Sequence, residues 1–176
     1  MVEKVWNSAD LPNRNTKSNR LCRLMNDFGR LPFPFKIIAK QLRQLLLKEL
    51  KKGDVQIIHV DYGFNLLFGN LSGGPVYFSD TMLLDYEFVT FGANVLIGPA
   101  CKIITSWHTE NNIHEIRAKP VSIGNNVWLT MNIIVLPGVS IGDNTIIGAG
   151  SIVTRSIPSN VIAAGNPAKV IREIKL

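Results

Sequence analysis

The residues best suited to chemistry in this sequence are its three histidines, His59, His108 and His114. His108 and His114 lie six residues apart in the segment SWHTENNIHEIRAKP, and His59 lies in the alternating segment QIIHV. Because an imidazole titrates near neutral pH, such a histidine can act as a general acid or base. Three histidines can also hold a zinc ion that keeps one coordination position open. The histidines alone leave both chemistries open.

A basic pair, Lys169 and Arg172, is the second candidate group and lies in the tail segment AKVIRE. Lysine and arginine bind phosphate groups by charge, and arginine adds a bidentate fork. The alternative is an ordinary solvated C-terminus. Because Pro167 cannot donate to a strand ladder, we expect the tail to turn and run along the outside of the fold, with both cations on one edge.

The elements that must position these residues follow a six-residue repeat. The first position of nine hexads is always apolar: Phe91, Ile97, Ile103, Ile123, Leu129, Val135, Ile141, Ile147 and Val153. The second position is glycine at 92, 98, 124, 142 and 148, and we expect these glycines to supply positive φ at corners. Six residues make one flat strand and one corner, and three such units close a triangular coil. The repeat therefore predicts an all-β solenoid, a parallel β-helix, over residues 56–165.

The histidine segment interrupts this repeat. A solenoid accommodates an insertion when the extra residues leave at a corner as an external loop. We therefore expect a protruding loop over about 107–120, with His108 at its base and His114 farther out. Loops that a rigid scaffold positions often carry chemistry.

Residues 1–55 are predicted to form a basic helical segment, and residues 166–176 a C-terminal tail. The segments SNRLCRLMNDFG and KIIAKQLRQLLLKELKKG have helical patterns, and the second is amphipathic. Residues 1–52 hold twelve Lys and Arg against four acids, a net +8, whereas the remainder holds seven against nine, a net −2. Such a segment suits an acidic polymer or a membrane surface, or it is the solvated face of helices that cap the solenoid.

Composition narrows the class of protein. The chain has 176 residues, of which 46% are hydrophobic and 18% charged, values typical of one globular domain. No apolar run reaches the ~18 residues of a membrane span, and the start MVEKVWNSAD is unlike a secretory signal. Cys22 and Cys101 are isolated, which argues against a disulfide framework and a thiolate metal site. We therefore expect a cytoplasmic protein.

Several segments resemble the hexapeptide-repeat sugar O-acetyltransferases, the group that includes galactoside, maltose and nodulation-factor acetyltransferases. The resemblance covers about residues 55–175 and rests on VDYGFNLLFG, VTFGANVLIGPACKIITSWH, IGNNVWL, PGVSIGDNTIIGAGSIVT and IPSNVIAAGNPAKVIREI. It implies a left-handed parallel β-helix and a homotrimer with sites between subunits. It also implies a saccharide acceptor and acetyl-CoA as co-substrate, without a metal.

The same resemblance assigns roles to residues. His108 is implied as the general base that takes a proton from a sugar hydroxyl while the hydroxyl attacks the thioester directly in a ternary complex. The acceptor side is implied to use Asp61, Asp80 and Asp85. The donor side is implied to use Trp128, Met131, Ala149, Thr154, Arg155, Lys169 and Arg172, with a backbone N–H at the Met131 corner for the oxyanion.

Two departures from the family pattern bear on these roles. Phe78-Ser79-Asp80 replaces an Asn-x-Asn pair on the acceptor side, which leaves the particular sugar open. The extra acid also fits an amine, so an N-acetyltransferase acting on an amino sugar or another amine is an alternative. Thr130 and Met131 occupy a corner that the family usually keeps small.

Two further alternatives come from other classes. Carbonic-anhydrase-like β-helices bind a metal through three histidines, but they place two of them five residues apart, and here the spacing is six. A non-catalytic solenoid that acts as an interaction module is the other alternative. Zinc content would test the first, and acetyl transfer would exclude the second.

Overall fold

The described part of the chain is a parallel β-helix with three flat faces. A computed structural model describes residues 4–7, 55–60, 65–66 and 71–175. Face A contains β6 (Val89–Phe91), β11 (Val121–Ile123) and β14 (Ser140–Ile141). Face B contains β7 (Val95–Ile97), β12 (Trp128–Leu129), β15 (Ile146–Ile147) and β17 (Val161–Gly165). Face C contains β3 (Asn65–Leu66), β5 (Met82–Leu84), β8 (Lys102–Ile104), β13 (Ile134–Val135) and β16 (Ile152–Val153).

The N-terminal coils join faces A and B through one long strand. The first part of β4 (Leu71–Phe78) pairs with β6 of face A, and its last part pairs with β7 of face B. The strand β2 (Val55–Val60) pairs with β4 in parallel. One strand therefore belongs to two faces, and its pairing shifts by one residue between Gly73 and Val76, where the sheet turns the corner.

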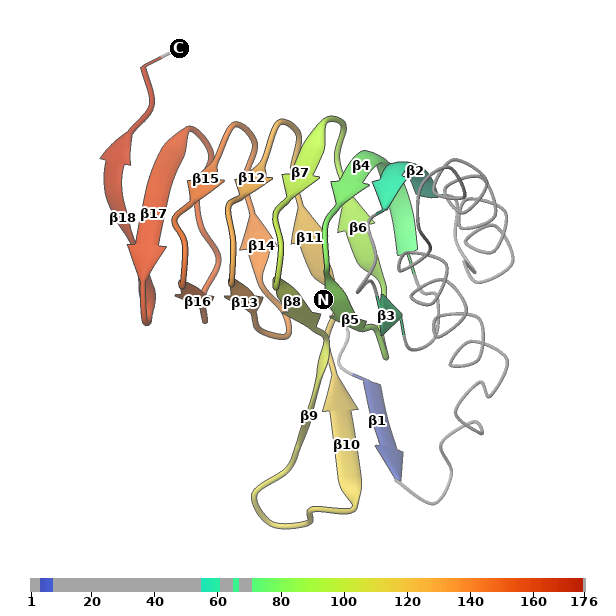
Figure 1. Cartoon of the computed structure of the whole chain (residues 1–176). Coiled ribbons are helices and arrows are strands. Elements are labelled where there is room, and N and C mark those ends of the chain that lie inside the picture. Colours follow the sequence, from blue (N-terminus) through green and yellow to red (C-terminus); the bar gives the residue numbers. More distant parts are fainter. Residues whose placement is uncertain (1–3, 8–54, 61–64, 67–70, 176) are drawn as a thin grey trace.

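The coils wind in the left-handed sense. In Figure 1 the chain advances from right to left, the strands of face B run downward on the near side, and the strands of face A run upward behind them. This combination of rotation and advance is left-handed, as the family resemblance implied.

Two expectations fall outside the described residues. The helices expected over residues 18–29 and 36–53 lie there, and so does Asp61. Where the structure does describe the segment expected to be helical, at residues 4–7, the chain forms a strand instead. Of the described residues, none belongs to a helix, so none forms a helix long and apolar enough to cross a membrane.

The hexad pattern correctly predicted the core. All nine first-position residues from Phe91 to Val153 are buried, each at 5% exposure or less. Successive coils stack these residues directly on one another, because the ladder pairs Ile123 with Ile141 and Leu129 with Ile147. Burying each such side chain contributes about 1.5–3 kcal/mol. Cys101 belongs to the same core, where burial raises the pKa of its thiol.

The reason expected for the hexad glycines was wrong. None of the five second-position glycines has a positive φ. They are needed because successive coils approach closely: a Cβ on Gly98 would collide with the carbonyl oxygen of Thr130, and one on Gly124 with the carboxylate of Asp143. The residue two positions later usually adopts the left-handed conformation instead. At the edge between faces A and B, edge AB, that residue is asparagine in three coils, Asn94, Asn126 and Asn144, and Asn160 takes the same place in the last coil, where a proline replaces the glycine.

These asparagines also connect the coils along edge AB. The side-chain amide of Asn94 donates to Asn126 at 3.1 Å, that of Asn126 to Asn144 at 3.0 Å, and that of Asn144 to Asn160 at 2.9 Å. Asparagine tolerates a positive φ better than most residues, so one residue type both forms the turn and links the coils.

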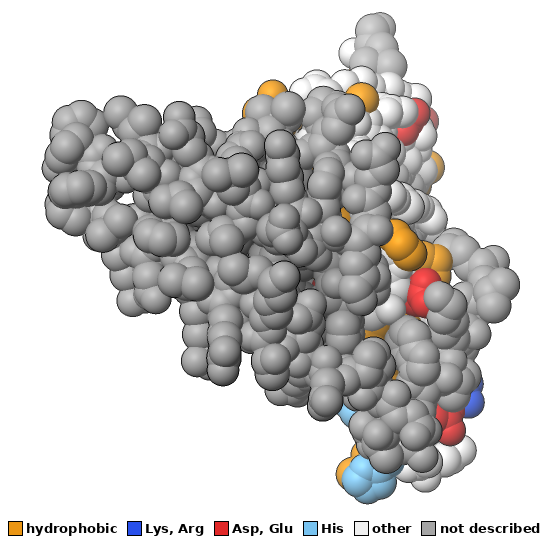
Figure 2. Space-filling model, turned by 90° about the vertical axis from the view of Figure 1, so that its right-hand side faces the viewer, with side chains coloured by type: hydrophobic (Ala, Val, Ile, Leu, Met, Phe, Trp, Pro, Cys, Tyr) orange, Lys and Arg blue, Asp and Glu red, His pale blue; other side chains and the backbone are white. Residues whose placement is uncertain are grey.

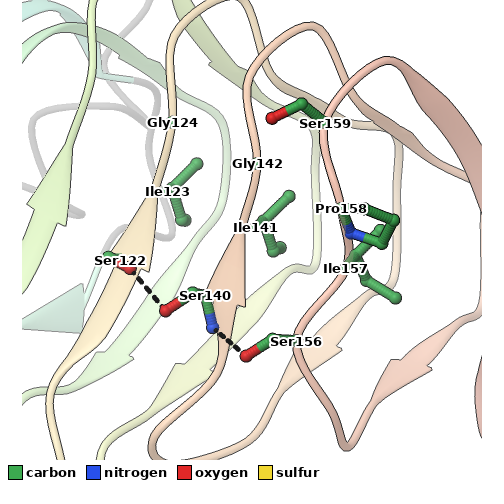
Figure 3. Close-up of a pocket in the computed structure, with 10 residues that line it drawn as sticks. All are labelled: Ser122, Ile123, Gly124, Ser140, Ile141, Gly142, Ser156, Ile157, Pro158 and Ser159. Carbon is green, nitrogen blue, oxygen red and sulfur yellow. Dashed lines mark hydrogen bonds between the residues drawn. The ribbon is translucent and has the colours of Figure 1, made fainter. Parts of the chain in front are cut away.

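The outer surface of face A is a row of hydroxyl groups. Ser122 Oγ donates to Ser140 Oγ at 2.8 Å, and the Ser140 N–H donates to Ser156 Oγ at 3.0 Å, as Figure 3 shows. These residues line an open groove of about 540 Å³ that carries no charged side chain. Face B differs, because its outward positions include the exposed apolar side chains of Leu96 and Trp128. Face A therefore presents serine hydroxyl groups outward, whereas face B presents apolar side chains that are suited to a partner or ligand.

The expectation that the C-terminal tail runs along the outside of the fold was wrong. After Gly165 the chain reverses and forms β18 (Ala168–Glu173), which pairs antiparallel with β17 and extends face B by one strand. Pro167 lies in the reversal itself, where no ladder donor is needed, so it does not prevent β18 from joining the ladder.

The close approach of the coils predicts which glycine the fold tolerates least. Replacing Gly98 by alanine should lower the free energy of unfolding by about 3 kcal/mol or more, because the new Cβ meets a backbone oxygen that cannot move alone. Gly150 has a φ of +73°, and a Cβ there would have no atom within 4 Å, so Gly150→Ala should cost only about 1–2 kcal/mol. Urea denaturation at one protein concentration measures both, and equal losses would contradict the packing explanation.

Candidate active site

The interruption of the repeat is a β-hairpin that projects from the solenoid. Ladder partners in the regular coils lie 18 residues apart, whereas those across the interruption lie 32 apart, so 14 residues are inserted. They form β9 (Ser106–His108) and β10 (Glu115–Ala118), which pair antiparallel, and β1 (Lys4–Asn7) pairs with β10 on the other side. Figure 1 shows this small sheet extending away from the coils beside β8. The expected loop is therefore confirmed, and it has regular structure.

The base of the hairpin is fixed by Thr105. Its hydroxyl donates to the Leu84 carbonyl oxygen at 2.9 Å, and its own carbonyl oxygen accepts from the Lys119 N–H at 2.8 Å. Lys119 then places its ammonium group 5.5 Å from the centre of the Trp107 ring. A cation over an indole ring is an attractive contact, so β9 leaves the solenoid in a defined direction. Trp107 and Lys119 were not among the predicted site residues, and the hairpin turn was not predictable from a two-residue signal, because its Glu115 N–H donates to the Asn112 carbonyl oxygen at 2.9 Å across Ile113 and His114.

Both described histidine side chains lie on the hairpin. His108 is exposed and ends β9, opposite Ile116 of β10. His114 is exposed at the turn, where its N–H donates to the Asn112 side chain at 3.0 Å. Figure 2 shows histidine atoms at the lower extremity of the molecule. His108 is thus three residues beyond the base at Thr105, on a strand, whereas His114 belongs to the turn.

Residues predicted for the acceptor side and residues predicted for the donor side lie on the same edge, the edge between faces B and C, edge BC. Successive coils place Asp80, Pro99, Met131 and Ala149 there in one row. Backbone hydrogen bonds connect this row from coil to coil. The residue that follows each member donates its N–H to the carbonyl oxygen of the member one coil earlier: Ala100 to Asp80 at 2.9 Å, Asn132 to Pro99 at 2.9 Å and Gly150 to Met131 at 3.0 Å. At a usual strand spacing of 4.7–4.9 Å, the two coil steps from Asp80 to Met131 span about 10 Å. Asp80 is exposed, whereas Phe78 is fully buried and cannot contact an acceptor.

The backbone N–H groups of Met131 and Ala149 in this row are open. At the matching position of edge AB, three successive N–H groups donate to a side chain of the next coil: Ala93 to Asn125 at 2.8 Å, Asn125 to Asp143 at 2.7 Å and Asp143 to Ser159 at 3.0 Å. On edge BC the N–H groups of Met131 and Ala149 make no hydrogen bond within the described residues, although their neighbours Thr130 and Gly148 donate to the next coil. Exposed N–H groups that point away from a rigid backbone are suited to bind a carbonyl oxygen or oxyanion.

A second group of predicted residues gathers on the outer side of face B. The ladder places Trp128 beside Leu96 and Ile146, and then Ile146 beside Ile162. Trp128 is 45% exposed, so its ring is open to a ligand. The row continues to Arg172, which pairs with Ile162.

A β-bulge brings the two tail cations to the same side. Residues three apart in a regular strand point to opposite faces. Here Lys169 pairs with Ala164 and Arg172 with Ile162, and the register shifts between them. Ala164 and Ile162 are two residues apart and both outward, since their neighbours Val161 and Ala163 are buried. Both cations therefore extend outward from face B, on the side of Trp128.

The remaining predicted residues lie elsewhere. Thr154 and Arg155 are exposed on the edge between faces C and A, the edge from which the hairpin also projects. Asp85 lies on that edge too, but it is 0% exposed, so its carboxylate is not accessible to a sugar that binds from solvent. Within the described side chains, no three His, Cys, Asp or Glu residues gather as metal ligands would.

Comparisons with known proteins agree on one family. Residues 120–155 match the bacterial transferase hexapeptide family, which has six repeats. The chain is 45% identical over 123 residues to galactoside O-acetyltransferase of Escherichia coli K12, an alignment that covers 66% of this chain and 58% of that relative. The fold matches the crystal structure of a maltose O-acetyltransferase from Clostridium difficile 630 with a TM-score of 0.85, at 31% identity and covering 98% of this chain and 94% of the other. A galactoside acetyltransferase in complex with coenzyme A matches with a TM-score of 0.75, at 34% identity, over 98% of this chain and 87% of the other.

Proposed function

Because this chain belongs to the hexapeptide-repeat sugar O-acetyltransferases, we propose that it transfers an acetyl group from acetyl-CoA to a hydroxyl group of a saccharide. The open N–H groups of edge BC carry this proposal, because they are suited to the oxyanion that forms when a thioester carbonyl is attacked. The coenzyme A complex of a relative 34% identical supports the donor. Screening acetyl transfer over neutral sugars, amino sugars and polysaccharides tests the function, and a preference for glucosamine nitrogen over sugar hydroxyls would favour N-acetylation instead.

In the proposed reaction, His108 acts as the general base. It takes the proton of the acceptor hydroxyl while the hydroxyl oxygen bonds to the thioester carbon, and the carbonyl electrons move onto the oxygen held by the Met131 N–H. When the tetrahedral intermediate collapses, the carbon–sulfur bond breaks and the CoA sulfur takes the proton from His108. No covalent enzyme intermediate is needed, because both substrates are held together and positioning lowers the barrier.

We propose that donor and acceptor lie along edge BC and face B. Trp128 would pack on the donor, Ala149 would bind its pantetheine arm through the open N–H, and Lys169 and Arg172 would bind its phosphates. Thr154 and Arg155 would contribute from the neighbouring edge. Asp80, exposed in the same row, would accept hydrogen bonds from the acceptor. Asp85 would act indirectly, by orienting groups near the hairpin base, because its carboxylate is buried.

We further propose a homotrimer in which each site lies between two subunits. The hairpin carries His108 away from its own solenoid, and face B leaves apolar side chains exposed, including Leu96 and Trp128. Both features are expected of a chain that completes its site with a neighbour.

His108→Ala should lower kcat at least about 10²-fold and leave the dissociation constant of acetyl-CoA nearly unchanged, because a base acts in the transition state. Steady-state kinetics and calorimetric titration measure the two quantities. His114→Ala is the matched control and should stay within about fivefold of wild type, since His114 lies at the turn. A His108→Ala enzyme as active as that control would exclude the assignment.

Met131→Pro should lower kcat about 10²–10³-fold, because proline lacks the N–H proposed to hold the oxyanion. The fold should tolerate this change, since Pro99 occupies the same row one coil earlier. Met131→Ala keeps the N–H and should retain most acetyl transfer, as measured by thiol release from acetyl-CoA. If the proline and alanine variants were equally active, the oxyanion would be bound elsewhere.

The Met131→Pro variant also tests whether each site is shared between two subunits. Chains with His108→Ala and chains with Met131→Pro, refolded together, should regain activity that neither has alone, because some sites then combine an intact histidine with an intact corner. Mixtures that remain as inactive as the separate variants would place both residues of a site in one chain.

Arg172→Ala should raise the KM for acetyl-CoA about tenfold and change kcat little, because a charge-assisted contact to phosphate acts on binding. Lys169→Ala tests the second cation in the same way. The sharper measurement compares acetyl-CoA with its analogue lacking the 3′-phosphate. If neither variant loses the wild-type discrimination between these donors, the cations do not contact that phosphate.

A further inference from the structure

We infer that the side chain of Met131 limits the size of the acyl group that the enzyme transfers. This inference rests on the proposed acyl transfer, but it concerns the side chain of Met131 and not its backbone. Met131 is 51% exposed, at the corner where its own N–H is open. A large apolar side chain and an open donor therefore belong to one residue on edge BC.

Met131 is the only long apolar side chain in its described row. Asp80 carries a short polar side chain, Pro99 a closed ring, and Ala149 a single methyl group. An acyl carbonyl that accepts from the Met131 N–H at about 2.7–3.1 Å brings its own alkyl chain beside that corner. The next coil offers only Ala149 there, so Met131 is the side chain that a longer alkyl chain would meet first.

The backbone around this corner cannot move aside to make room. Thr130 donates to the Ile147 carbonyl oxygen through both its hydroxyl, at 2.8 Å, and its N–H, at 3.2 Å. On the other side, the Thr130 carbonyl oxygen lies against Gly98 so closely that no Cβ would fit. Because the preceding residue is held from both neighbouring coils, adjustment at the corner is left to the Met131 side chain.

This arrangement predicts selectivity for short acyl groups. One methylene in a hydrophobic pocket changes specificity about 10–200-fold. Methionine is flexible and fills irregular space, so it closes around an acetyl group but occupies the volume that a butyryl chain requires. Shortening the side chain should open that volume and leave the oxyanion donor in place.

The test is a donor series of acetyl-CoA, propionyl-CoA and butyryl-CoA, with thiol release measured on 4-nitrophenyl galactoside and on maltose. Met131→Ala should raise the ratio of kcat/KM for butyryl-CoA to that for acetyl-CoA about tenfold or more. Met131→Leu, which conserves volume, should leave the ratio within about threefold of wild type. Met82→Ala is the matched control, because Met82 is 49% exposed but belongs to β5 on face C, away from the open N–H groups.

The ratio of the two donors separates selectivity from general damage, because any general loss of activity in Met131→Ala affects both donors alike and cancels. An unchanged butyryl-to-acetyl ratio in Met131→Ala, with wild-type acetyl transfer intact, would overturn the inference and leave the proposed function standing. An equal rise in Met82→Ala would also overturn it. If the wild-type enzyme released no thiol from acetyl-CoA with any acceptor of the saccharide screen or with water, the proposed function would fall, and the inference with it.

Discussion

The close contact between successive coils is the constraint on which the rest of this structure depends. Parallel strands of two or three residues form too few hydrogen bonds to be stable singly, so the fold persists only because each coil pairs with the next along all three faces. That pairing requires corners without a Cβ where the next backbone passes, as at Gly98 against Thr130. The buried aliphatic column and the asparagine links of edge AB follow from the same spacing, because each residue lies directly over its counterpart one coil earlier.

Because the backbone repeats, a difference in hydrogen bonding between equivalent positions of two edges is informative. Edges AB and BC have the same corner geometry and therefore present the same backbone donors. On edge AB these donors are satisfied by side chains such as Asp143, whereas on edge BC the N–H groups of Met131 and Ala149 are open within the described chain. One carboxylate or amide side chain per coil would be enough to accept a hydrogen bond from each open N–H, as the side chains of edge AB do. Two edges with one backbone thus have different uses, a linked edge that stabilises the coils and an open edge that is suited to a ligand.

The sequence predicted the repeat, the core and the interruption because each of these depends on spacing along one coil. It did not predict the hairpin's third strand, because β1 meets β10 more than a hundred residues later in the chain. It misjudged the glycines, because φ is a local property whereas the obstacle at Gly98 belongs to the next coil. The alignment of Lys169 with Arg172 on one side was expected, but the β-bulge that produces it was not, since three residues of a regular strand would have separated them. The family resemblance pointed to the backbone N–H at the Met131 corner, but the residues themselves could not show that this N–H is open, because whether a donor is free depends on the side chains of a neighbouring coil.

The order of residues along edge BC gives the proposed reaction a direction. Asp80 lies at the N-terminal side of the row and the open donors of Met131 and Ala149 at the C-terminal side, with Pro99 between them. Proline has no N–H, so the coil between acceptor and donor groups offers no competing donor for the thioester oxygen. In the proposed donor path along face B from the cations of β18, the thioester carbonyl would meet Ala149 before Met131, and Met131 would be the last open donor before Asp80. The carbonyl that reaches Met131 then lies about 10 Å from Asp80 by two coil steps. In the proposed reaction, a saccharide held at Asp80 and an acetyl group held at Met131 would approach each other along one edge, and the neighbouring subunit would contribute the base.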